Sequence, residues 1–86
     1  MSLNLAPHVS AVHVESGSVL LNQKTGRYWQ INGSASTILA ILTEGGTVEE
    51  ACQRLTDEYE VERPQAERDV RTLLDGLLSA GLVKEQ

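Results

Sequence analysis

The sequence has few of the residues that build catalytic, metal or disulfide sites. It contains one cysteine, Cys52, and two histidines, His8 and His13, so no internal disulfide bond can form. The histidines lack nearby carboxylate partners and do not have the i, i+4 spacing of a helical metal pair. Nothing in the sequence supplies a base that would activate the Cys52 thiol. We therefore expect no enzyme activity, no catalytic residue, no metal and no cofactor, with Cys52 as a small buried thiol and His13 facing solvent.

Basic charge is also scarce. Seven Lys and Arg residues stand against twelve Asp and Glu residues, which gives a net charge of −5. The basic residues are scattered, whereas nucleic-acid binding draws much of its affinity from a basic face. No apolar run reaches the length of a membrane span, and no secretory signal opens the chain. These absences predict a cytoplasmic protein whose partners are neither nucleic acids nor membranes.

The pattern of the first third of the chain predicts an antiparallel sheet. Of the 86 residues, we expect residues 1–8 to form a tail and residues 9–86 to form one domain. Segments rich in β-branched, aliphatic and aromatic residues occur at 9–14, 18–21 and 27–31, and each has the length of a strand. Short loops that contain glycine separate the three segments. A three-stranded meander follows from this arrangement.

After these strands the apolar residues change to helical spacing, which predicts three helices. Asn32 suits the N-cap of the first helix. Thr47 and Glu50 have the spacing of a capping box at the start of the second helix. Pro64 suits the first turn of the third helix, and Gly81 stands where a C′ glycine would end it. The predicted fold is α+β in the order βββααα, with the helices covering one face of the sheet.

The third predicted strand carries two of the three aromatic residues of the chain. In a meander this strand is an edge, and natural proteins usually blunt such edges with charge, proline or a covering segment. Residues 28–31 contain no charge and no proline, and only Arg27 precedes them. A partner strand could therefore add here. Alternatively, Trp29 and Ile31, which share a face, belong to the core, or they form the floor of a groove beside the third helix.

Three segments in order, at residues 19–32, 47–51 and 69–83, resemble the PqqD-like proteins, which are peptide-recognition elements for ribosomally made and modified peptides. The resemblance implies a winged-helix-like fold in which the leader segment of a precursor peptide adds as a further antiparallel strand. That strand would lie beside residues 27–31 and against the third helix. The implied peptide-binding residues are Arg27, Tyr28, Trp29, Gln30, Ile31, Asp69, Val70, Leu73 and Leu77. Among these, Leu73 and Leu77 would form an apolar wall, and Asp69 would bond the peptide or cap a pocket.

The resemblance implies two biosynthetic settings. One is the stand-alone leader-binding protein of lasso-peptide pathways, which delivers the precursor to a leader peptidase and a cyclase. The other is PqqD itself, which serves a radical enzyme that makes a quinone cofactor. The freestanding length and the run of residues 20–32 are more similar to the lasso type. Two further classes stay open: a winged-helix DNA-binding protein, and an assembly domain that forms a homodimer through the same edge strand.

Overall fold

The structure is a computed structural model that describes residues 3–85 of the chain. Strands β2, β3 and β4 form one antiparallel sheet, and three helices follow it, so the predicted α+β fold is confirmed. A second sheet of two short strands, β1 and β5, adds to the prediction. The elements in chain order are β1 (Leu3–Leu5), β2 (Val9–Val14), β3 (Gly17–Asn22), β4 (Tyr28–Asn32), α1 (Gly33–Thr43), α2 (Val48–Glu58), α3 (Arg63–Ser79) and β5 (Val83–Glu85).

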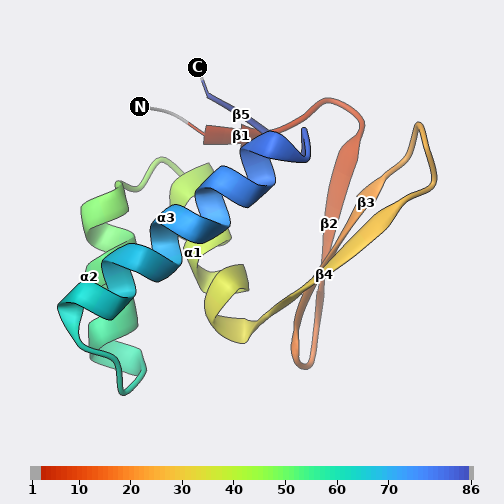
Figure 1. Ribbon diagram of the computed structural model, residues 1–86. Helices are drawn as coiled ribbons and strands as arrows, with labels where there is room; N and C mark the ends of the chain where they lie inside the picture. The colour runs from red at the N-terminus through yellow and green to blue at the C-terminus, as the bar shows by residue number, and fades with distance from the viewer. Residues whose placement is uncertain (1–2, 86) are drawn as a thin grey trace.

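The three-stranded sheet stands beside the helical part of the molecule (Figure 1). Its register places Leu20 of β3 opposite Trp29 of β4, and α1 packs against both strands. Leu20 is fully buried, which identifies this side as the inner face of the sheet. On the outer face Val12 and Tyr28 are 58% and 70% exposed. The sheet therefore uses one face for the core and leaves the other open.

Local signals in the sequence set where the helices begin. The Asn32 side chain accepts a hydrogen bond from the Ala35 amide over 2.9 Å at the start of α1. The capping box of α2 is present, because the Glu50 amide donates to Thr47 Oγ1 and the Thr47 amide donates to Glu50 Oε1. Pro64 lies in the first turn of α3, where its missing amide leaves no hydrogen bond unmade. Each predicted helix start is confirmed.

The first residues of the described chain do not form the predicted tail. Strand β1 pairs antiparallel with β5, with Leu3 opposite Glu85 and Leu5 opposite Val83. Leu3 is 3% exposed and belongs to the core. The first and last strands of the described residues therefore lie side by side (Figure 1). The prediction of a tail is wrong for residues 3–5. A strand of three residues has almost no pattern of its own, and its partner lies at the other end of the chain. Met1 and Ser2 lie outside the described residues.

The core lies between the inner face of the sheet, the three helices and the β1–β5 pair. Leu82, which follows the αL residue Gly81 after α3, turns back into this core. Among residues 3–85, no helix combines the length and the apolar composition needed to cross a membrane. The largest fully buried side chains are Leu20, Leu42, Leu82, Val70, Cys52 and Ser18.

Leu3→Ala should lower the free energy of unfolding by about 2–4 kcal/mol, because it removes buried methyl groups and leaves a cavity. Asn4→Ala is the matched control, since Asn4 is exposed in the same strand, and it should change stability by less than about 0.5 kcal/mol. Urea unfolding of both variants measures the difference. Equally small losses would mean that β1 contributes nothing to the fold.

Candidate functional site

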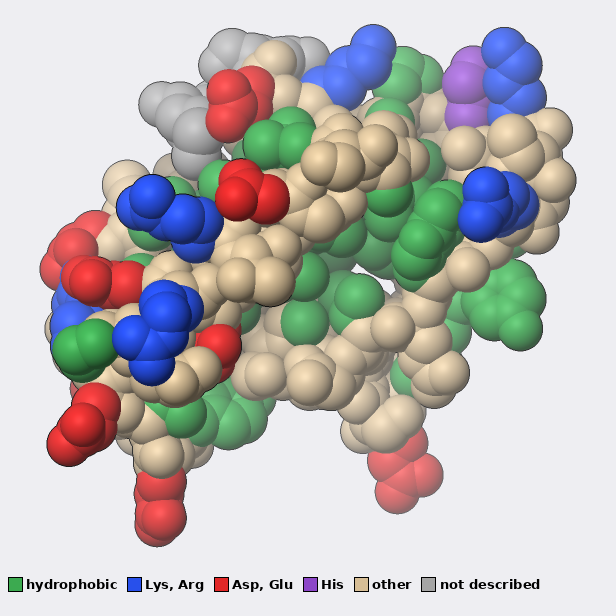
Figure 2. All heavy atoms as spheres, viewed as in Figure 1, with side chains coloured by type: hydrophobic (Ala, Val, Ile, Leu, Met, Phe, Trp, Pro, Cys, Tyr) green, Lys and Arg blue, Asp and Glu red, His purple; other side chains and the backbone are tan. Residues whose placement is uncertain are grey.

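An apolar groove runs between β4 and α3, and Figure 2 shows hydrophobic side chains gathered in the hollow between the helical part and the sheet. The groove consists of two hollows of about 350 and 360 Å³ that share Thr72 and Leu73. We call it the β4–α3 groove. The first hollow is lined by Trp29, Gln30, Ile31, Thr72, Leu73, Gly76, Leu77, Ala80 and Leu82. The second is lined by Asn32, Ser34, Ala35, Ile38, Asp69, Thr72 and Leu73.

The walls of the first hollow are mainly apolar side chains, several of which are only partly covered. Trp29 and Ile31 alternate along β4 on the inner face, and Leu73 of α3 also lines the groove; all three pack against the core while remaining half-buried. Leu77 lies one helical turn after Leu73 and is 4% exposed. Such a surface can still bury apolar groups of another molecule.

The free edge of β4 borders the groove. At the hairpin turn the Asn22 amide donates to the Arg27 carbonyl over 2.9 Å, and hydrogen-bonded positions alternate along an antiparallel pair. The backbone groups of Trp29 therefore bond to β3, whereas those of Tyr28 and Gln30 face away from it. The main contacts of β4 are with β3 and α1, so α3 does not cover this edge. Within residues 3–85, the edge thus offers amide and carbonyl groups without a strand partner.

Gly17 fixes the distance between β3 and the far end of β4. Its φ is +151°, which L side chains rarely adopt. A Cβ at this position would lie 1.9 Å from the carbonyl oxygen of Ile31. Only glycine therefore lets the chain pass close enough to pair with Asn32. The turn signal that predicts a hairpin here also positions the groove.

Opposite charges stand near the two ends of the groove. The Arg27 guanidinium lies 5.6 Å from the centroid of the Trp29 ring, in cation–π geometry. Asp69 lines the second hollow, and its Oδ1 accepts a hydrogen bond of 2.7 Å from the Gln65 side chain. Both charged side chains are exposed.

The structure brings together six of the nine predicted site residues as groove lining, namely Trp29, Gln30, Ile31, Asp69, Leu73 and Leu77. Arg27 adjoins them through Trp29, and Tyr28 contributes backbone to the edge while its side chain projects from the outer face. Val70 is a correction. It is fully buried and adjoins the hollow between α2 and α3, so it cannot contact a peptide in the groove.

The sequence interpretation missed small residues on α3. Gly76 and Ala80, which are one turn apart, line the first hollow. Because neither has a bulky side chain, the helix leaves space opposite Trp29 and Ile31. Their i, i+4 spacing on the side of the helix next to the leucines is a signal that could have identified the groove wall.

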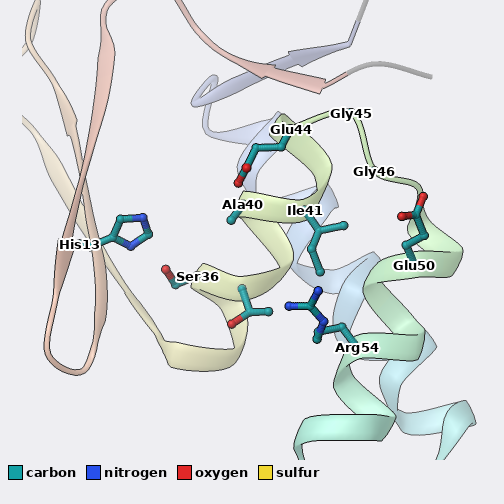
Figure 3. Close-up of a pocket in the computed structure, with 10 residues that line it drawn as sticks. His13, Ser36, Ala40, Ile41, Glu44, Gly45, Gly46, Glu50 and Arg54 are labelled. Atoms are coloured by element: carbon teal, nitrogen blue, oxygen red, sulfur yellow. The ribbon is translucent and has the colours of Figure 1, made fainter.

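A larger hollow of about 610 Å³ lies between β2, α1 and α2, but its lining is mainly polar and charged. Figure 3 shows His13 and Arg54 pointing toward it from different elements. His13 is exposed, as predicted, and its Nδ1 lies 3.2 Å from Ser18 Oγ. In the described residues, no three His, Cys, Asp or Glu side chains are grouped so as to hold a metal ion. This hollow offers no apolar wall beside a strand edge.

Cys52 is 1% exposed in α2. Burial raises the pKa of its thiol, although the Coulomb effect of Arg63 opposes the rise. A nucleophilic cysteine needs the opposite shift, because the thiolate is the reactive form. The buried thiol predicted from the sequence is confirmed.

The fold and the groove define a class of small α+β domain that keeps one sheet edge open beside an apolar helix face. Residues 17–83 match the family described as Coenzyme PQQ synthesis protein D (PqqD). The chain belongs to the PqqD family, and it has the structure of a PqqD-like recognition element for ribosomally made and modified peptides (RiPPs).

Two solved structures are similar to this chain over almost all of its length. One is lasso peptide synthetase B1 complexed with the leader peptide: its TM-score is 0.91, its sequence identity is 38%, and the match covers 99% of this chain and 100% of that chain. The other is TbiB1 in complex with the TbiA(beta) leader peptide, with a TM-score of 0.85, an identity of 32% and coverage of 96% of each chain. The comparison with curated protein sequences gives no match.

Gly17→Ala should destabilise the protein by more than about 2 kcal/mol, because its Cβ would collide with the backbone of Ile31 and its φ would be strained. Gly26→Ala is the control. Gly26 also has a positive φ, +78°, but a Cβ there meets nothing within 4 Å, so a loss of about 1 kcal/mol is expected. Denaturant unfolding separates the two. If both variants lose the same amount, the close approach of β3 to β4 is not what makes Gly17 necessary.

Proposed function

We propose that this protein captures the leader segment of a ribosomally made precursor peptide as an additional antiparallel strand on β4. The observation that carries the proposal is the unpaired edge at Tyr28 and Gln30, with the apolar β4–α3 groove directly beside it. Strand addition obtains affinity from backbone hydrogen bonds and specificity from pockets for alternate side chains. The edge of β4 would supply the backbone hydrogen bonds, and the groove would supply the pockets for side chains.

The two solved structures support this proposal. Both contain a leader peptide, and both are more than 30% identical to this chain over almost its full length. One of them is a lasso peptide synthetase component. This favours a leader-binding role in lasso-peptide biosynthesis over service to the radical enzyme of quinone-cofactor synthesis.

The energetics of capture are consistent with the size of the groove. A leader segment is disordered when free, so ordering it on the strand has an entropic cost. Each apolar side chain buried in the groove contributes about 1.5–3 kcal/mol before that cost is subtracted. Trp29, Ile31 and Leu73 are the half-buried groups that gain contacts. One or two such side chains, together with backbone pairing along β4, would offset the ordering of a short segment.

The other edge of the same sheet is a poorer site. Strand β2 also has a free side, but it borders the hollow that contains His13, Glu44 and Arg54. An extended chain there would find these charged side chains and an apolar hollow of only about 110 Å³, which is lined by Leu5, Ala11 and Leu39 among others. The groove therefore distinguishes the two edges, and β4 is the edge that suits a partly apolar peptide.

In this proposal the module has no catalytic role and acts by presentation. It would hold the precursor for a leader peptidase, and for a cyclase acting afterwards, so that the peptide reaches the enzyme at a high effective concentration. Cys52 supports the assignment, since its raised pKa and burial make it a poor nucleophile. The module itself would break no bond.

Gly76→Leu should abolish or strongly weaken leader binding without unfolding the protein. Gly76 lies in the last turn of α3 on the groove wall, and a Cβ there meets nothing within 4 Å. A leucine would fill the space that a leader side chain needs, so affinity should fall by more than about tenfold. Replacing a helical glycine should also stabilise α3 by up to about 1 kcal/mol.

The ligand in this experiment is the leader segment of the precursor peptide encoded beside the gene, titrated by calorimetry, with thermal unfolding measured in parallel. Gly76→Ala is the matched control and should keep most of the affinity. Arg71→Ala should leave affinity unchanged, because Arg71 is exposed and lines the hollow between α2 and α3. Full affinity in a folded Gly76→Leu variant would contradict the groove as the binding site.

Strand addition also predicts which amides exchange more slowly with solvent. The Gln30 amide faces the free edge of β4 and should be protected when the leader binds. Ala11 faces the free edge of β2 by the same alternation, since the Gln23 amide donates to the His8 carbonyl, and it should not change. Amide exchange followed by NMR tests both. Protection at Ala11 would move the site to β2, and protection of Gln30 that grows with protein concentration without peptide would indicate a homodimer.

A further inference from the structure

The lining of the β4–α3 groove is almost free of charge. Of the described residues that line its two hollows, Asp69 is the one ionisable side chain. Arg27 stands at the opposite end, against the Trp29 ring. Lys24, in the adjacent hairpin turn, adds a second positive charge at that end. The groove is therefore apolar in the middle, basic at one end and acidic at the other.

Neither end charge is neutralised by the protein. The ion pairs among residues 3–85 involve Arg54, Arg63 and their glutamate partners, and they include neither Arg27 nor Asp69. Asp69 accepts a hydrogen bond from the neutral amide of Gln65. Both end charges are consequently available to a ligand. Arg27 precedes β4 and Asp69 lines the hollow beside its last residue, Asn32, and the five residues of β4 span about 17 Å, which exceeds the Debye length of about 8–10 Å at 0.1–0.15 M salt. Each end therefore acts on its own part of a peptide.

An antiparallel strand added to β4 runs opposite to it. Its N-terminal part would lie beside Ile31 and Asn32, next to the second hollow that contains Asp69. Its C-terminal part would lie beside Tyr28, next to Arg27. A parallel strand would meet the same two charges in the reverse order.

We propose that Arg27 and Asp69 select the direction and register of the captured peptide by charge. The preferred ligand is an extended, partly apolar segment with basic residues at its N-terminal end and acidic residues at its C-terminal end. The inference rests on the proposed function and adds a charge pattern to the substrate. A segment displaced along β4, or bound in the parallel direction, brings like charges together and is disfavoured.

The test is a charge-reversal cycle between protein and leader. The ligand is the leader segment of the precursor encoded beside the gene, in its natural form and in two synthetic forms in which the charges at one end are reversed. Arg27→Glu and Asp69→Lys should each weaken binding of the natural leader by roughly 3- to 10-fold at about 50 mM salt, and the effect should shrink at about 0.5 M salt. The leader with reversed charges at its C-terminal end should bind the Arg27→Glu variant with restored affinity, but not the Asp69→Lys variant. The leader with reversed charges at its N-terminal end should bind the Asp69→Lys variant with restored affinity, but not the Arg27→Glu variant.

Matched controls separate local effects from the change in net charge. Arg71→Glu and Asp75→Lys make the same charge changes on exposed residues that line the hollow between α2 and α3, and they should leave affinity within about twofold. If the C-terminal reversal instead restored binding to Asp69→Lys and the N-terminal reversal to Arg27→Glu, the antiparallel direction of the bound peptide would be overturned. Binding that ignores both reversals, or a natural leader with the opposite end charges, would overturn the selection by charge. If the unaltered protein binds no leader at all, the proposed function fails and this inference fails with it.

Discussion

The structure depends on a strand that is hydrogen-bonded on one side only. Strand β4 pairs with β3, packs on α1 and leaves the backbone of Tyr28 and Gln30 without a partner in the described chain. An open edge of this kind invites association between copies of a protein. The edge is limited here by its length of five residues and by the charge of Arg27 at its start. The open edge of β4 is therefore short, and it has a positive charge at one end.

The far wall of the groove is fixed by contacts at the other end of the fold. Helix α3 ends before Gly81, whose positive φ turns the chain so that Leu82 enters the core. Strand β5 then pairs with β1 and ties this turn to the start of the chain. The C-terminal end of α3 is thus tied to the start of the chain, while the helix as a whole packs mainly on α2 and β4 pairs with β3. Helix α1 packs against both β4 and α3, so it connects the two walls of the groove.

Signals that act over a few residues predicted the fold well, and signals that depend on distant partners did not. Asn32 and Thr47 mark helix starts by accepting hydrogen bonds from nearby backbone amides, and Pro64 does so through its fixed φ and missing amide, so the sequence around each contains the whole cause. The β1–β5 pair has no such local cause. Val70 was misplaced for a related reason. An apolar stripe on a helix is wide enough to face two directions, and only the packing of α2 against α3 decides that Val70 faces the core while Leu73 faces the groove.

A peptide strand on β4 would complete features that the domain lacks by itself. Three strands with a single covered face are near the minimum for a stable sheet, and a domain of this size leaves much apolar surface uncovered. A fourth strand would pair the free backbone groups and cover Trp29 and Leu73, so the same contacts that give affinity also extend the core. Because a ligand that binds only the folded state stabilises it by mass action, capture of a peptide strand on β4 would be coupled to the stability of the domain. In the proposed complex, the backbone groups that stay unpaired along β4 in the free domain would therefore be paired by the peptide, which would add to the stability of the fold.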